Sequence, residues 1–215
     1  MLGYFKTFFY PTGQNDELQG HHPGPQVVLI HGANQSSKSF GYIASNLPDW
    51  NITMVNYSCY ETFDDNLHSM IELLANRGPL FLVGHSLGGI YAAHLSQHLN
   101  VVGGVTLSAP YGGSSMADWA KYIVPGFPLL RDVGRRSKPI QDLRNFKIKV
   151  PWLQLVSASG HVPWINEPND GVLTINSMRA MPGIEYQDVD VNHYEIMCDD
   201  SVIDIIVNRY YNSIQ

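Results

Sequence analysis

The sequence predicts an α/β fold in which a mostly parallel, doubly wound sheet carries helices on both faces. Two observations lead to this fold class. Apolar, β-branched runs alternate along the chain with segments whose apolar residues recur at helical spacing. The runs also lack the in-and-out alternation of a half-exposed sheet, as is typical of parallel strands buried on both faces. At 215 residues with 44% hydrophobic residues, the chain can fill one core, so we expect a single domain over 1–215.

The expected strands share β-branched or aromatic side chains and are bounded by glycine, proline or asparagine. The first of them is a single leading strand at the start of the chain. The strands are expected at 1–10, 27–30, 52–57, 80–83, 101–107, 150–156 and 186–191.

Helices are expected between these strands because their ends carry stop and start signals. Ser36 or Ser37 can cap a helix that Pro48 stops. Thr62 with Asp65 three residues on resembles a capping box for the next helix. The helices are expected over 36–47, from 62 to 77, from 87 onward and over 201–211.

The regular pattern is lost between Tyr111 and about Lys149, and we expect a lid-like insertion at 111–149. A long excursion inside a compact domain is usually functional, although it can also pack over a sheet edge. Its apolar face, with Trp119 and Phe127, can contact a lipid surface transiently or pack on its own core. Four cations in it can receive an anionic head group or form a solvated loop: Arg131, Arg135, Arg136 and Lys138.

Charge, hydropathy and cysteine content indicate which classes of partner and which cellular location to expect. A net charge of −6 with 15% charged residues argues against nucleic acid. No apolar run approaches the ~18 residues of a transmembrane segment. The first ten residues lack the pattern of a signal peptide, and two cysteines make neither a disulfide framework nor metal spacing. We therefore expect a cytoplasmic protein with reduced thiols.

The sequence GHSLGG at 84–89 follows directly on the apolar run at 80–83. This arrangement predicts a nucleophile elbow, a tight strand-to-helix turn that exposes the hydroxyl of Ser86 above the sheet. Flanking glycines matter because strand and helix approach closely there.

A serine nucleophile needs a histidine base that an acid holds in one tautomer. Asp170 lies in a turn after the strand ending at residue 156, and His193 follows the last strand. Both stand in the order that an elbow fold requires. The alternatives are His161 as the base and Glu167, Asp188 or Asp190 as the acid, while His31 and His85 are expected to brace their turns.

An oxyanion needs two backbone donors. The amide of Leu87 follows the nucleophile at a helix N-terminus, and the amide of Ala33 follows the strand at 27–30. Asn34 can help to hold this loop, although the alternative is that His31 and Gly32 form only a turn.

Four motifs together resemble those of the α/β-hydrolase superfamily, and within it the bacterial lipases and esterases. They are IHGA at 30–33, GHSLGG at 84–89, NDGV at 169–172 and NHYE at 192–195. SAPYGGS at 108–114 is also similar to the segment after the sixth strand of many lipases. The resemblance implies a metal-independent ester hydrolase that forms an acyl-serine, with no cofactor. The single leading strand, where the full fold has two, implies a reduced sheet.

We therefore expect a serine esterase or lipase for small-molecule or lipid-like esters with apolar or medium-chain acyl groups. Its triad would be Ser86, His193 and Asp170. The same triad also allows acyl transfer, or thioester, polyester or amide cleavage, and a catalytically weak ligand-binding protein is the third reading. The residues expected to line the substrate site are Asn34, Tyr111, Trp119 and Phe127.

Overall fold

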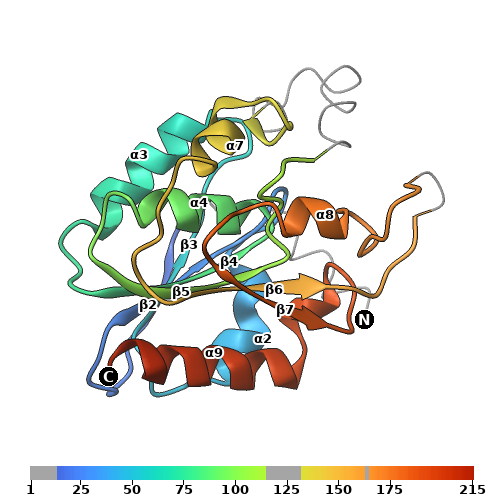
Figure 1. Ribbon diagram of the computed structural model, residues 1–215. Helices are drawn as coiled ribbons and strands as arrows, with labels where there is room; N and C mark the ends of the chain where they lie inside the picture. Colours follow the sequence, from blue (N-terminus) through green and yellow to red (C-terminus); the bar gives the residue numbers. More distant parts are fainter. Residues whose placement is uncertain (1–13, 115–131, 163–164) are drawn as a thin grey trace.

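The computed structural model describes residues 14–114, 132–162 and 165–215. These residues form one seven-stranded sheet with the order β1-β3-β2-β4-β5-β6-β7 (Figure 1). Only the edge strand β1 runs antiparallel to its neighbour, and every other pair is parallel. The strands are β1 Asp16–Leu18, β2 Gln26–Ile30, β3 Ile52–Val55, β4 Leu80–His85, β5 Val101–Leu107, β6 Trp152–Ser157 and β7 Glu185–Val189.

Helices cover both faces of this sheet. In Figure 1, α3, α4 and α7 lie over one face, and α2 and α9 lie over the other. The doubly wound α/β class expected from the sequence is therefore confirmed. The helices and turns are η1 Ser37–Phe40, α2 Gly41–Ser45, α3 Phe63–Leu74, α4 Leu87–Leu95, α7 Lys138–Leu143, α8 Ile175–Met178, η2 Glu195–Met197 and α9 Asp200–Ser213.

The six expected strands from 27–30 onward are each found within a few residues of their predicted bounds. The strand expected at 1–10 lies outside the described residues, and the leading strand that the structure contains is β1. The helix expected over 36–47 is wrong as one element, because a 3-10 turn and a short α-helix replace it. Serine-rich segments favour caps and tight turns over helix interiors.

The start of α3 follows its capping signal. The Thr62 hydroxyl accepts a hydrogen bond from the Asp65 amide at 3.2 Å, which confirms the first half of the expected box. Beyond the helix, Gly78 has φ +79°, a left-handed conformation that glycine adopts without strain. Thr62 thus marks the start of α3, and Gly78 lies in the turn between α3 and β4.

Each face of the sheet has its own apolar core. Val28, Leu82 and Ile90 belong to the cluster that packs between the sheet and the α3–α4 layer. Val83 and Ile206 belong to the cluster beneath α9. Helices cover both faces, and α/β sheets typically bind their ligands at the carboxyl ends of the parallel strands. None of the helices in the described ranges has the length and hydropathy needed to span a bilayer.

Strand β4 and helix α4 meet closely where a side chain would not fit. A Cβ at Gly88 would lie 1.9 Å from the carbonyl oxygen of Ile30, and one at Gly84 would lie 2.4 Å from the carbonyl of Gly88. The glycines of the motif therefore let the helix begin directly against the sheet.

We expect Gly88→Ala to lower the free energy of unfolding by about 3 kcal/mol or more, because backbone atoms must move to admit the methyl group. Urea unfolding followed by circular dichroism measures it. Gly78→Ala is the matched control, because its Cβ would meet open space and only its positive φ costs stability, about 1–2 kcal/mol. A loss at Gly88 no larger than that at Gly78 would contradict this reading of the close approach.

Candidate active site

Ser86 lies at the point where β4 ends and α4 begins. Its backbone has φ 52° and ψ −121°, outside the usual regions for an L-residue. Such strain persists only where the surrounding structure fixes it, and here it lifts the half-buried side chain above the sheet edge. Ser86 thus has the backbone conformation that the elbow motif predicts.

Asp170 and His193 form a buried carboxylate–imidazole pair. Asp170 lies on the loop after β6, and His193 lies on the loop after β7. Their side chains are 0% and 3% exposed, and His193 Nδ1 lies 2.6 Å from Asp170 Oδ2. The His193 amide also donates to the Asp170 carbonyl at 3.1 Å. Both backbone and side chain therefore fix the histidine against the acid.

The Asp170 carboxylate accepts three further hydrogen bonds. Oδ1 accepts from the amides of Val172 (3.0 Å) and Leu173 (2.7 Å), and Oδ2 accepts from the Ser157 hydroxyl at 2.5 Å. Burial by itself raises the pKa of the Asp170 carboxyl. The hydrogen bond and charge of His193, with the Ser157 and Leu173 donors, outweigh burial and lower that pKa below its ordinary value. The carboxyl group is thus held ionised.

The loop after β2 is held by hydrogen bonds on both sides of Ala33. The Gly32 amide donates to Gln35 Oε1 at 2.9 Å, and the Asn34 amide donates to Cys59 Sγ at 3.1 Å. Among the described residues, none accepts from the Ala33 amide. Leu87 begins α4, where amides have no acceptor within the helix. The two amides expected to form an oxyanion hole are therefore both available as donors.

Two histidines brace the turns, as expected. His85 Nδ1 lies 3.1 Å from Gln35 Oε1, and its Nε2 lies 2.9 Å from the carbonyl of His193. His31 stacks on Tyr57 with ring centroids 4.2 Å apart. Burial lowers the pKa of His85 to about 3 and that of His31 to about 4, so both rings are neutral. His85 thereby links the loops after β2 and β7.

A cavity of about 310 Å³ joins these groups. Ser86 and His193 both line it, together with the Ala33–Gln35 loop. Among the residues that the structure describes, no hydrogen bond joins the Ser86 hydroxyl to the His193 ring. Catalytic hydrogen bonds are often long in the absence of substrate. The remaining wall is largely apolar and includes Leu87, Pro110, Val133, Val172, Leu173 and Tyr194.

The other residues expected at the substrate site fare differently. Asn34 lines the cavity, but Tyr111 is 2% exposed and lies in the core. Its hydroxyl contacts Thr106 Oγ1 at 2.8 Å and accepts from Trp152 Nε1 at 3.1 Å. Tyr111 turns inward because these buried polar groups need a partner, so its expected place at the substrate site is corrected. Trp119, Phe127 and Arg131 lie outside the described residues, and the lid stays a prediction.

The alternative acids and base are exposed on the surface, and the acids contact other residues there. Asp188 pairs with Arg179 at 2.5 Å, and Asp190 accepts from Ser159 at 2.6 Å. Glu167 accepts from Asn176, and His161 lies on an exposed loop. The structure brings none of these three acids, nor His161, to Ser86.

The described part of the cation cluster lies at the surface. Lys138 pairs with Asp142 at 2.8 Å, and Arg135 and Arg136 are exposed.

Several site residues carry no signal in the sequence. Gln35, Ser157 and Val133 belong to no recognisable motif, and only their position after a strand or in the insertion could have indicated them. Ser108 begins the segment SAPYGGS, but that motif does not indicate its contact with Ser157. Their roles follow from contacts that the fold creates.

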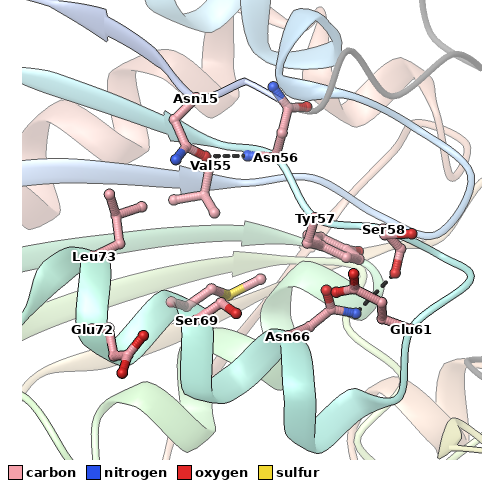
Figure 2. Close-up of a pocket in the computed structure, with 11 residues that line it drawn as sticks. Asn15, Val55, Asn56, Tyr57, Ser58, Glu61, Asn66, Ser69, Glu72 and Leu73 are labelled. Atoms are coloured by element: carbon pink, nitrogen blue, oxygen red, sulfur yellow. Dashed lines mark hydrogen bonds between the residues drawn. The ribbon is translucent and has the colours of Figure 1, made fainter.

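A larger cavity of about 600 Å³ lies between β3 and α3 (Figure 2). It contains Ser58 and Ser69 near Glu61 and Glu72, and the Asn66 side-chain amide donates to the Ser58 carbonyl at 2.9 Å. Its described wall holds no histidine beside a serine. This cavity therefore lacks the pairing on which nucleophilic catalysis depends. In the part of the chain that the structure describes, no three His, Cys, Asp or Glu side chains gather as a metal site.

The sheet, the elbow and the buried acid–histidine pair at the carboxyl ends of the strands define the class of the α/β hydrolases. The comparison with protein families agrees. The model of the alpha/beta hydrolase family matches residues 27–169, well over half of the chain. The chain therefore belongs to this family.

Among relatives and solved structures, the chain is similar to lipases and esterases. The chain is 32% identical over 84 residues to lipase LipV of Mycobacterium tuberculosis, a match spanning 34% of this chain and 32% of the relative. A lipase-esterase related protein of Clostridium acetobutylicum superposes with TM-score 0.69 at 14% identity, over 91% of this chain and 98% of that one. The mature lipase BlEst2 of Bacillus licheniformis gives TM-score 0.68 at 16% identity, over 93% and 98%.

Proposed function

We propose that the chain is a serine carboxylic-ester hydrolase of the esterase or lipase type. One observation carries this proposal: His193, which forms a buried 2.6 Å pair with Asp170, lines the same cavity as Ser86 at its strained turn. The similarity of the chain to lipases and esterases supports it.

In the proposed mechanism, Ser86 Oγ attacks the acyl carbonyl carbon of the ester, and the proton of the serine hydroxyl passes to His193 Nε2. The amides of Ala33 and Leu87 donate to the oxyanion that forms. His193 then gives the proton to the departing alcohol, which leaves an ester on Ser86. A water molecule, deprotonated by His193, cleaves that ester and restores the serine. Asp170 accepts from Nδ1–H throughout and keeps Nε2 free to take the proton.

The cavity favours an apolar acyl group. Val133, Val172 and Leu173 line it, and about 310 Å³ holds a short or medium chain better than a long one. We therefore propose small-molecule or lipid-like esters with apolar or medium-chain acyl groups as the substrates.

The test is hydrolysis of p-nitrophenyl esters from acetate to palmitate, together with labelling by a fluorophosphonate. We expect turnover that is highest at short or medium length, and labelling of one serine. Labelling without ester turnover would replace ester hydrolysis by amide or thioester cleavage, and new esters formed with added alcohols would indicate acyl transfer. Neither turnover nor labelling in folded protein would overturn the proposal in favour of ligand binding.

A further inference from the structure

Two buried serines lie directly behind the acid. Ser157 ends β6 and Ser108 follows β5, and both are 0% exposed. Strands β5 and β6 are neighbours, and the Ser108 amide continues their pairing by donating to the Leu155 carbonyl at 2.9 Å. The two hydroxyl oxygens lie 2.7 Å apart. The parallel sheet thus places both hydroxyls beside the loop that carries Asp170.

The direction of this hydroxyl chain follows from its end. The ionised Asp170 carboxylate only accepts, so at 2.5 Å the Ser157 hydroxyl must donate to Oδ2. Because Ser157 has one hydroxyl proton, the Ser108 hydroxyl donates to Ser157 in turn. Each hydroxyl therefore polarises the next toward the carboxylate.

The chain ends on the oxygen that faces the histidine. Asp170 Oδ2 accepts from Ser157 and from His193 Nδ1, whereas Oδ1 accepts from two backbone amides of its own loop. Without the Ser157 hydroxyl, Asp170 Oδ2 would keep the hydrogen bond from His193 but lose the one from Ser157. The position and the negative charge of the carboxylate would then be less stabilised. Ser108 itself has φ 51°, close to the 52° of Ser86, on the same edge of the sheet.

We propose that Ser157 and Ser108 are positioning residues, a two-hydroxyl relay that fixes the carboxylate of Asp170 toward His193 during ester hydrolysis. This inference rests on the proposed function of the same site. Neither hydroxyl touches the substrate, and both act through Asp170.

The test compares Ser157→Ala and Ser108→Ala with Ser159→Ala. Ser159 also donates to an aspartate, Asp190 at 2.6 Å, but on the exposed surface, so it is the matched control. We expect Ser157→Ala to lower kcat ~10-fold with KM unchanged, since a charge-assisted hydrogen bond is lost. Ser108→Ala should lower kcat less, and Ser157→Thr, which keeps a hydroxyl, should restore most of it. Ser159→Ala should match the wild type.

A second readout does not depend on turnover. The proton between His193 Nδ1 and Asp170 Oδ2 is expected as a downfield NMR signal, and Ser157→Ala should shift it while Ser159→Ala leaves it in place. Variants with wild-type kcat and an unmoved signal would overturn the relay, as would a loss of thermal stability without change in kcat. Failure of the proposed function is distinguishable, because the wild-type protein itself would then show no ester turnover, with or without serine labelling.

Discussion

Ser86→Ala is expected to abolish ester hydrolysis, lowering kcat by about 10⁴ to 10⁶-fold, as removal of a triad serine does in other hydrolases. The physical reason is that the proposed attack needs a hydroxyl held above the strand end, where the turn at φ 52° places Ser86. The remaining rate would come from the backbone donors and the cavity alone. Steady-state kinetics with the preferred p-nitrophenyl ester measures the change.

The control is Ser69→Ala, which removes an exposed hydroxyl from α3 in the larger cavity. It should retain wild-type kinetics. Both variants should keep the wild-type melting temperature and circular dichroism, since Ser86 is half-buried at the cavity rather than packed in the core. Substantial turnover or fluorophosphonate labelling in Ser86→Ala would remove Ser86 from the mechanism.

Asp170→Asn is expected to lower kcat by about 10³ to 10⁴-fold, the order of effect that such a change has in serine proteases. An asparagine can turn its NH₂ group toward His193 Nδ1, which then becomes an acceptor and leaves the proton on Nε2. The imidazole would then be in the tautomer that carries its proton on Nε2, the nitrogen that faces Ser86. In that tautomer Nε2 cannot accept the proton of the serine hydroxyl.

The comparison for this variant comes from the exposed carboxylates that the sequence also offered. Asp188→Asn and Glu167→Gln should each keep kcat within about 2-fold of the wild type, because their exposed contacts with Arg179 and Asn176 contribute little. The measurement is kcat/KM of all three variants on one ester. If Asp170→Asn lowered kcat/KM no more than Asp188→Asn does, the 2.6 Å contact between Asp170 and His193 would have no role in the chemistry.

Most of the fold was predictable from local patterns. Buried parallel strands are continuous apolar runs, so the local sequence predicts β2, β4 and β6 without knowledge of the strands beside them. The segment at 36–47 was harder, because its serines favour both caps and tight turns. The four-residue α8 was not expected, since it is too short to show a helical period.

For the site, motif order and strand ends predicted Ser86, Asp170 and His193, because the proposed chemistry needs those residue types in that order. The structure pairs Asp170 with His193, and His193 lines one cavity with Ser86. The residue-level expectation failed at Tyr111, whose hydroxyl turns to Thr106 and Trp152 in the core. A sequence cannot say which way a side chain beside a strand end points, because that depends on which buried polar groups lie nearby.

By itself the sequence determined the α/β class, predicted the strained turn at Ser86, and indicated Asp170 and His193 as the candidate acid and base. These depend on local spacing, on glycine at close approaches and on the order of strands along the chain. Only the tertiary structure decided which groups meet: Ser157 and Ser108 on Asp170, His85 between Gln35 and His193, and Cys59 beneath the Ala33 loop. Such contacts join residues from different strands. They exist because parallel pairing brings the carboxyl ends of those strands to one edge, a register that no local pattern encodes.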